Sequence, residues 1–276
     1  LYTPLLILTI WFLPLPFFLY TAKYSWPSAI PPAVVLSVLT LILFHPLLIF
    51  AVLFAAATGM VMGALYRSST STGTDVVLAG LVVGTLVLLL GIFVAQYGFG
   101  VLTEFQRLWQ EQWELAVEWV KDSVPDASVP ALPPISAVLP LLLSMLIVPT
   151  VLLSAWLGRR LLKRSGFSEK RLPPFYRWRF PKSFLYFYLL ATLALFLFGA
   201  ENEAYPFFSG LFMILECLFV VQGLSFLAFL LRSKGKSQGW LWPSVLALFF
   251  PPVAFLLLVL GILDVGTRWR ERMEKR

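Results

Sequence analysis

A single carboxylate near the middle of an apolar run is the residue best placed to do chemistry in this chain. Glu216 lies in the segment 207–231, which is otherwise almost wholly apolar. A carboxylate at that depth in a membrane costs roughly 2.5–3.5 kcal/mol on insertion scales, so such groups usually face a bundle interior, a cavity or a partner. Three roles follow for Glu216: it binds a cationic or hydroxylated ligand, relays a proton, or makes a structural hydrogen bond to a neighbouring helix.

Small and polar residues accompany Glu216 on the same segment. Ser209 and Gly223 lie seven residues on either side of it and share its helix face. Gly210 and Gly223 have no side chain, so they let another helix approach closely. Gln222 lies about 120° round the helix from Glu216. That position favours an interhelical hydrogen bond, although Gln222 and Ser209 both stay candidate ligand-binding residues.

His45 is the only histidine, and Pro46 follows it directly. Imidazole titrates near neutral pH, so one hypothesis is a proton-linked role in ligand binding. We favour the alternative that His45 caps a broken helix or reaches the membrane interface, because the helices on both sides of it are short. Cys217 is the only cysteine, which excludes an intramolecular disulfide and argues against a cysteine-based metal site.

Close helix packing is also predicted in the segment 46–66. Gly59 and Gly63 lie four residues apart among several alanines, a spacing that lets two helices meet along small residues. We favour packing within this chain over the docking of a membrane-protein partner.

The segment 172–181 alternates aromatic residues with arginines. Such residues can stack on nucleic-acid bases, but at a membrane surface they anchor to headgroups and anionic lipid, which we favour. Docking of a protein partner is the third interpretation. The candidate contact residues in this segment are Arg177, Trp178 and Arg179.

The composition indicates a membrane protein with several helices. Hydrophobic residues make up 59% of the 276 residues and charged residues 13%, whereas soluble domains carry about 25% charged residues. A helix needs about 20 apolar residues to cross a bilayer, so we expect an all-α, multi-pass transmembrane bundle in the cell membrane. The eight hydrophobic helices expected are 4–20, 30–44, 46–66, 76–97, 135–157, 183–198, 207–231 and 240–263. Pro14 and Pro16 should bend the first, and Thr74 or Asp75 should cap the fourth.

The segment 101–124 differs in kind from the apolar segments. Its hydrophobic residues recur at helical spacing, while glutamates and glutamines take most of the other positions. This pattern predicts an amphipathic helix. Trp109 and Trp113 suit the membrane interface, where they would contact lipid. A helix packed as a lid on the bundle is the alternative, and the sequence favours neither.

The basic residues predict the orientation of the chain. Nine basic residues and one acid fall within 159–182, which is the signature of a cytoplasmic loop. Arg67 and the basic residues of 232–236 then lie inside, and the acidic loop 98–133 lies outside. The net charge of +7 therefore reflects topology, and we do not expect nucleic acid as a partner.

The C-terminal tail conflicts with this orientation. A single crossing by 240–263 would leave the basic tail outside. A break at Pro251 and Pro252 into a re-entrant pair would bring the tail back inside, and the sequence does not decide between the two.

Three stretches also carry a family resemblance. They are Leu172-Pro-Pro-Phe-Tyr-Arg-Trp-Arg-Phe-Pro181, Val221-Gln-Gly-Leu-Ser225, and Gly261-Ile-Leu-Asp264 followed by Arg268-Trp-Arg270. In order and spacing they resemble the YybS-like family of predicted bacterial membrane proteins, which is defined by a domain of unknown function. The resemblance implies one further span before residue 1 and a fold similar to the substrate-binding (S) components of energy-coupling-factor vitamin transporters. Residues 1–165 would form that S-component-like core, and 166–276 a C-terminal three-helix region. The family has no established catalytic residues, so none is carried over.

Motifs of common enzyme classes are absent from the sequence. It contains no Gly-rich nucleotide loop, no HExxH and no GxSxG. We therefore expect no catalytic site, metal or cofactor, and a protein that binds a small molecule or lipid within its bundle, in transport or as a transporter subunit. One alternative is a scaffold or assembly factor that recruits a membrane protein or a second copy through 172–181. The other is an intramembrane enzyme acting on a lipid-linked substrate.

Overall fold

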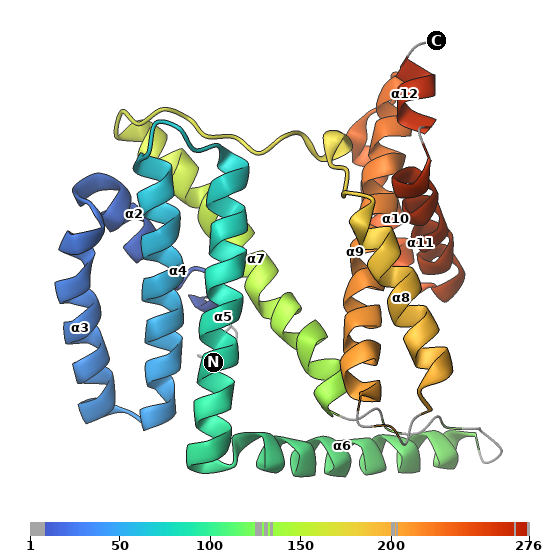
Figure 1. Ribbon diagram of the computed structural model, residues 1–276, viewed down its shortest axis with the longest axis horizontal. Helices are drawn as coiled ribbons and strands as arrows, with labels where there is room; N and C mark the ends of the chain where they lie inside the picture. The colour runs from blue at the N-terminus through green and yellow to red at the C-terminus, as the bar shows by residue number, and fades with distance from the viewer. Residues whose placement is uncertain are drawn as a thin grey trace. The chain divides into compact units, whose positions relative to one another are not determined.

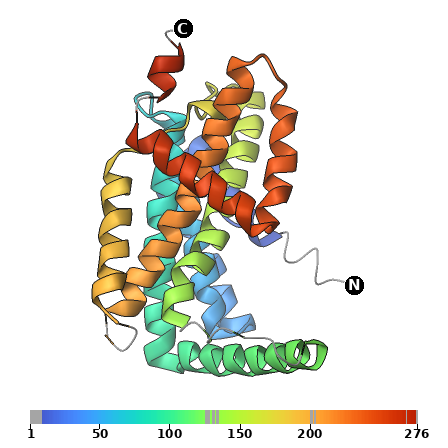
Figure 2. The same ribbon diagram turned by 90° about the vertical axis from the view of Figure 1, so that its right-hand side faces the viewer.

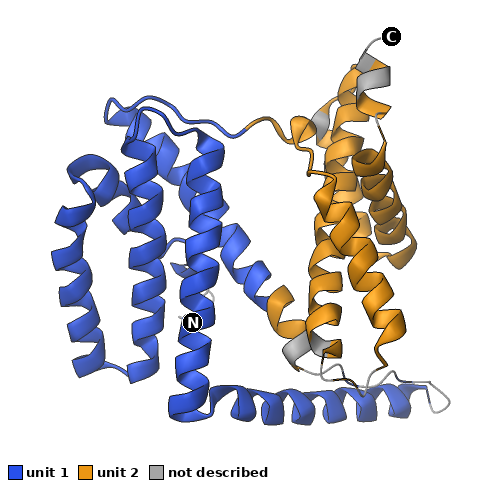
Figure 3. Cartoon of the chain, in the orientation of Figure 1, with its two compact units in different colours: residues 1–132, 142–172 blue, residues 133–141, 173–276 orange. Residues whose placement is uncertain are grey.

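The computed structural model describes residues 9–124, 129, 132, 135–199, 202, 204–267 and 269–274 (Figure 1). Within these ranges the chain is helical and contains no strand, as the sequence predicts. It divides into two compact units (Figure 3): residues 1–132 with 142–172, and residues 133–141 with 173–276. Helix α7 (Ile135–Arg164) begins in the second unit and continues in the first.

The first unit is built around a central helix. Its elements are α2 (Leu15–Tyr24), α3 (Trp26–Leu43), the 3-10 turn η1 (Pro46–Leu48), α4 (Ile49–Arg67), α5 (Gly73–Phe99), α6 (Val101–Ser123) and most of α7. Helix α4 packs against α2, α3 and α5. A Cβ added at Gly59 would lie 2.3 Å from the Pro14 carbonyl oxygen, and one at Gly63 would lie 2.6 Å from that of Phe18. The two glycines therefore pack against α2, which confirms close packing within the chain.

Proline places the helix breaks of the first unit. Helix α3 ends at Leu43 and η1 begins at Pro46, so the break predicted at His45 is confirmed. The predicted helix 4–20 is interrupted: residues 9 and 10 are helical, the chain turns over 11–14, and α2 begins at Leu15. Residues 4–8 of this prediction lie outside the described residues. Pro14 and Pro16 occupy the start of α2, where a missing N–H disturbs no helical hydrogen bond.

The N-terminus of α5 lies earlier than predicted. Thr72, not Thr74 or Asp75, is the N-cap: its hydroxyl accepts the Asp75 N–H at 3.3 Å, and the Asp75 carboxylate accepts the Thr72 N–H at 2.7 Å. This reciprocal capping box satisfies two backbone donors. The apolar run marks only the lipid-facing part of the helix, so the polar first turn was missed.

One end of the first unit collects the segments predicted to lie inside. Arg67 donates to the backbone carbonyl of Lys23 at 3.0 Å, and Lys170 donates to that of Leu65 at 3.1 Å. The ends of α2 and α4 therefore meet the start of the basic loop. These contacts agree with the grouping of Arg67 and 159–182 on one side of the membrane.

Five helical segments among the described residues are long and apolar enough to cross a membrane. They are Trp26–Leu43, Pro46–Arg67, Gly73–Phe99, Val138–Arg164 and Phe207–Ser233. Helices α8 (Ser183–Leu197) and α11 (Pro251–Gly266) are apolar but shorter. The described residues therefore contain the helices of a multi-pass membrane protein, and the count of eight hydrophobic helices stays a prediction.

The second unit packs around α9 (Tyr205–Ser233), which lies against α8 and α11. A Cβ added at Gly223 would lie 2.0 Å from the Leu257 carbonyl oxygen, and one at Gly261 would lie 1.9 Å from that of Phe219. The two glycines therefore let α9 and α11 cross with their backbones in contact. Gly210 is also buried on α9.

The segment 240–263 is two helices and not one crossing. The short α10 (Leu241–Leu246) is followed by the 3-10 turn η4 (Ala247–Phe249), and α11 starts at Pro251. Pro251 and Pro252 lack an N–H, so they suit only the first turn of a helix. Figure 2 shows the chain turning back at this break before it reaches α12 (Trp269–Glu274). Of the two alternatives that the sequence left open, the structure has the break at the two prolines.

Candidate functional site

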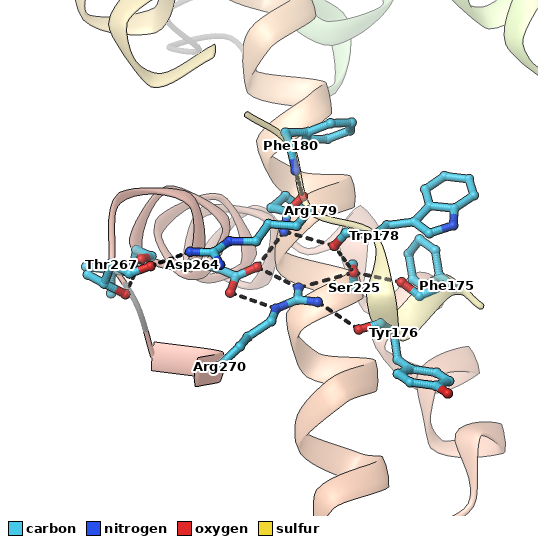
Figure 4. Close-up of polar contacts among 11 residues, drawn as sticks. Phe175, Tyr176, Trp178, Arg179, Phe180, Ser225, Asp264, Thr267 and Arg270 are labelled. Atoms are coloured by element: carbon cyan, nitrogen blue, oxygen red, sulfur yellow. Dashed lines mark hydrogen bonds and ion pairs between the residues drawn. The ribbon is translucent and has the colours of Figure 1, made fainter. Parts of the chain in front are cut away.

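A cluster of buried polar side chains lies at the centre of the second unit (Figure 4). Helix α9 contributes Gln222 and Ser225, α11 contributes Asp264 and α12 contributes Arg270. Gln222 is 1% exposed, Asp264 is not exposed, and Arg270 is 7% exposed. We call these four residues the Arg270 cluster.

An ion pair forms the core of the Arg270 cluster. Arg270 Nε donates to Asp264 Oδ1 at 2.8 Å and Nη2 donates to Oδ2 at 2.5 Å, which is the bidentate fork of a strong charge-assisted pair. Gln222 Nε2 also donates to Asp264 Oδ2, at 2.5 Å. Arg270 also donates to the Tyr176 carbonyl at 2.7 Å and to the Ser225 hydroxyl at 3.2 Å. Both buried charges are therefore well satisfied.

The Arg270 cluster also holds the irregular backbone of 175–180. Gln222 accepts the Phe180 N–H at 3.1 Å and donates to the Trp178 carbonyl at 3.2 Å. The Ser225 hydroxyl lies 2.8 Å from the carbonyls of both Phe175 and Trp178. Backbone without helical hydrogen bonds needs such partners when it is buried. Gln222 thus makes the interhelical hydrogen bond favoured by the sequence, to α11, and fastens a loop as well.

The three candidate contact residues of the segment 172–181 differ in exposure and in hydrogen bonding. Arg177 is exposed, and its guanidinium lies 5.7 Å from the Tyr176 ring centre. Arg179 is also exposed but donates to the Thr267 carbonyl at 2.7 Å. Trp178 is half-buried, and its indole N–H donates to the Pro173 carbonyl at 2.9 Å. The contacts of Arg179 and Arg270 bring the start of the tail to this segment, which agrees with the re-entrant alternative.

Glu216 lies apart from the Arg270 cluster. It is half-buried and lines a crevice of about 400 Å³ with Cys217, Val220 and three residues of α11. Among the described residues it makes no hydrogen bond or ion pair. Ser209 is half-buried on the same helix but does not line this crevice. Glu216 therefore faces a lateral opening between α9 and α11.

His45 and the tryptophans of α6 have local surroundings. His45 is exposed, and its Nδ1 accepts the Leu47 N–H at 3.3 Å, so it caps η1 as the sequence favours. Trp109 and Trp113 are half-buried on α6, which has no fully buried residue. Large apolar side chains of α6 are exposed, among them Trp119 at 72%. The interfacial helix and the lid both stay predictions.

A large apolar cavity in the first unit lies between α2, α3 and α4. Its volume is about 900 Å³. The lining is apolar except for Thr9 and Tyr20, and none of the site residues expected from the sequence contributes to it. Prolines 16 and 32 and the small residues Ala51 and Ala55 leave this space unfilled. Their small size was the signal in the sequence that could have indicated a cavity.

The sequence also contained an overlooked signal for the Arg270 cluster. Asp264 ends an apolar run and precedes Arg270 by six residues, yet neither was a candidate site residue. Acids near the end of an apolar helix are commonly solvated at the interface, so the more deeply placed Glu216 was the stronger candidate for a site residue. The signal was the combination of Asp264 with Gln222 and Ser225, two polar residues three apart on one helix face.

Comparison with known proteins gives one match. A family model described as "Predicted membrane protein (DUF2232)" matches residues 1–265. No curated protein and no solved structure matches the chain. The membrane-protein part of the expected resemblance is confirmed, whereas the YybS-like name and the S-component-like core stay predictions.

Proposed function

The chain belongs to this family of predicted membrane proteins, and from that premise we propose that it binds an apolar small molecule or a lipid in the cavity between α2, α3 and α4. The observation that carries the proposal is the size and lining of that cavity. Its volume of about 900 Å³ falls within the range of roughly 300–1,000 Å³ of ligand sites. Transport, or a role as a transporter subunit, is the concrete form of this function.

The lining indicates the chemistry of the ligand. The cavity is open on one side, since Leu36 and Leu39 in its lining are 43% and 45% exposed, and apolar walls without neighbours lack dispersion contacts. A hydrocarbon ligand restores those contacts. Tyr20 is 41% exposed beside the cavity, so its hydroxyl is placed to meet one polar group of the ligand.

The weak packing of α3 supports a transport role. Only Ala29, Ala33 and Thr40 are buried among its 18 residues. Ser25, which joins α2 to α3, has φ 107° and ψ 164°, a backbone region occupied almost only by glycine and costing about 1–3 kcal/mol. A strained link beside a loosely packed helix suits a gate that swings to admit the ligand.

Adjacent valines of α3 offer a matched test. Val35 lines the cavity and Val34 does not, and their exposures are 57% and 54%. Val35→Trp should fill the cavity and weaken binding of a hydrophobic fluorescent probe at least tenfold, or about 1.4 kcal/mol. Val34→Trp should bind the probe as the unaltered protein does. Equal affinities of the two variants would refute the proposal.

A scaffold role is the second candidate function. The Arg270 cluster fixes the backbone of 175–180 while the Arg177 side chain stays exposed, which is how a rigid docking surface would be presented. Arg177→Gln combined with Lys182→Gln should then abolish co-purification of a membrane-protein partner. Arg164→Gln combined with Lys163→Gln removes the same charge elsewhere, and an equal loss in that control would count against the scaffold.

A further inference from the structure

We propose that a pocket at the basic end of the first unit binds a phosphate group, carried by an anionic lipid or free in solution. The pocket has a volume of about 220 Å³ and is separate from the apolar cavity, so it does not rest on the function proposed above. Its polar lining residues are Tyr66, Arg159 and Lys170. A phosphate group with a few waters fits this volume, because one water occupies about 30 Å³ of liquid.

Arg159 supplies the donors for the ligand. Its side chain is 23% exposed, and its Nε is fully buried without a hydrogen-bond partner among the described residues. The carboxylate of Glu169 is 3.8 Å from that nitrogen, beyond hydrogen-bond distance. A buried donor without an acceptor is costly. The planar guanidinium matches two phosphate oxygens at once, so phosphate is the acceptor that it fits best.

The neighbouring carboxylate is already occupied by other cations. Glu169 Oε2 accepts from Arg171 at 2.7 Å and from Lys163 at 3.0 Å. These bonds, that of Arg171 first, lower the pKa of Glu169 to about 2, so it stays ionised at neutral pH. Three cations, Arg159 included, share this one carboxylate. Positive charge is therefore left over beside the pocket.

The remaining polar residues hold the pocket in shape. Lys170 Nζ donates to the Leu65 carbonyl at 3.1 Å, to the Ser71 hydroxyl at 2.7 Å and to the Ser68 carbonyl. All three N–H groups of the Lys170 ammonium are therefore hydrogen-bonded, and burial lowers its pKa. The Tyr66 hydroxyl donates to the Ser168 carbonyl at 3.1 Å. These contacts hold the loop in place and use the donors of Lys170 and Tyr66. Arg159 is therefore the polar lining residue whose donors are available to a ligand.

One charged neighbour of the pocket on α5, the ionised carboxylate of Asp75, has the same sign as the proposed anion. Asp75 is the acid in the first turn of α5, and its carboxylate is engaged with Thr72 in the capping box. Gly73 and Val76 of the same turn line the pocket. The N-terminus of a helix carries partial positive charge and favours anions. The positive end of α5 therefore offsets part of the repulsion by Asp75, and the attraction of the pocket rests on Arg159.

The other walls suit the part of a lipid below its headgroup. Val77, Leu152 and Ala155 line the pocket, and Trp156 lies beside them with 44% of its surface exposed. The Arg160 guanidinium stacks 4.0 Å from the Trp156 ring centre. Tryptophan and arginine are typical of the headgroup level, and basic pockets between helices at the cytoplasmic side bind lipid phosphates.

Native mass spectrometry of the purified full chain tests the site. The protein would be titrated with phosphatidylglycerol, with phosphatidylcholine and, separately, with inorganic phosphate. Arg159→Gln should weaken phosphatidylglycerol binding by about tenfold, because charge-assisted hydrogen bonds are lost. Arg164→Gln, which removes the same charge outside the pocket, should leave binding unchanged. Glu169→Gln removes the competing carboxylate and should strengthen binding by about threefold.

Each outcome decides the proposal. If inorganic phosphate binds and displaces the lipid, the phosphate group alone is recognised; if only the anionic lipid binds, the lipid is the source. Equal losses in Arg159→Gln and Arg164→Gln would show unspecific surface attraction and overturn the proposal. Equal binding of both lipids without a phosphate signal would overturn it as well. If Arg159→Gln does not fold, an unchanged affinity in Glu169→Gln refutes the site and a gain supports it.

Discussion

Two arginines, one in each unit, meet a carboxylate in opposite ways. Arg270 is 7% exposed and spends its donors on Asp264, Tyr176 and Ser225. Arg159 has no hydrogen bond among the described residues, and its nearest carboxylate is shared with two other cations. An arginine whose N–H groups are hydrogen-bonded within the protein stabilises the fold, whereas one with an unsatisfied N–H group is available to a ligand. Sequence position alone does not distinguish the two, because both lie in basic stretches at the end of an apolar helix.

The largest effect is expected where the saturated pair is broken. Arg270→Gln leaves the buried Asp264 carboxylate without its cation, which should lower the free energy of unfolding by about 3–5 kcal/mol. Thermal unfolding in detergent measures it. The double variant Arg270→Gln with Asp264→Asn should lose less than the two single variants together, because they share one interaction. Additive losses would show that the pair does not act as a unit.

A second large effect concerns the crossing of α9 and α11. Gly223→Ala places a methyl group where only 2.0 Å separates it from the Leu257 carbonyl, so the helices must move apart at a cost of about 1–3 kcal/mol or more. Gly98→Ala on α5 is the control, since nothing lies within 4 Å of its added Cβ. Thermal unfolding should separate the two variants, and equal melting temperatures would contradict the packing described for α9.

Arg159 should contribute less to stability than Arg270 does. Because its donors are unspent, Arg159→Gln should change the free energy of unfolding by less than about 1 kcal/mol while it abolishes selective binding of anionic lipid. Thermal unfolding without added lipid measures the first quantity. A loss of unfolding free energy as large as that of Arg270→Gln would mean that Arg159 also stabilises the fold through its contacts.

Glu216 gives a third case, a carboxylate with no cation beside it. Glu216→Gln should leave insertion and folding intact, because the side chain makes no hydrogen bond or ion pair among the described residues and lines the crevice between α9 and α11. If Glu216 takes part in ligand recognition, this variant abolishes uptake or binding. Unaltered binding in the folded variant would exclude Glu216 from the site and leave the cavity of the first unit as the binding region.

The smallest effect concerns pH. The pKa of Glu169 is lowered from 4.5 to about 2 by Arg171 and Lys163. A lowered pKa in the folded protein gives stability that is present above about pH 4.5 and is lost as the pH falls towards 2. Hydrogen exchange of the 168–172 amides should therefore stay constant from pH 8 to about pH 5, after correction for the intrinsic rate, and lose protection below about pH 4. Loss of protection near pH 6 would contradict the ion pairs of Glu169.

Much of the fold could be predicted because the relevant signals are local. Runs of apolar residues marked most of the helices, and Pro46 marked a break, since proline disturbs the interior of a helix. The break at Pro251 was one of two alternatives that the sequence left open. The bend expected at Pro14 and Pro16 is a full interruption, because the two prolines start a new helix, α2. The candidate sites were predicted less well. Glu216 stood out as a lone acid, whereas the Arg270 cluster depends on residues from four separate segments.

The sequence by itself determined that this chain is an all-helical, multi-pass membrane protein, with its basic loop grouped beside Arg67, because hydropathy, proline and charge act through the solvent and the nearest turns. Only the tertiary structure decided which arginine is saturated. Arg270 meets Tyr176, 94 residues away in sequence, while the Nε of Arg159 has no hydrogen-bond partner in the part of the chain that the structure describes. Such contacts depend on how helices cross, and the crossing of α9 and α11 depends on two glycines whose backbones touch. The physical reason is that hydrogen bonds act over about 3 Å, a distance that no pattern along the chain can specify.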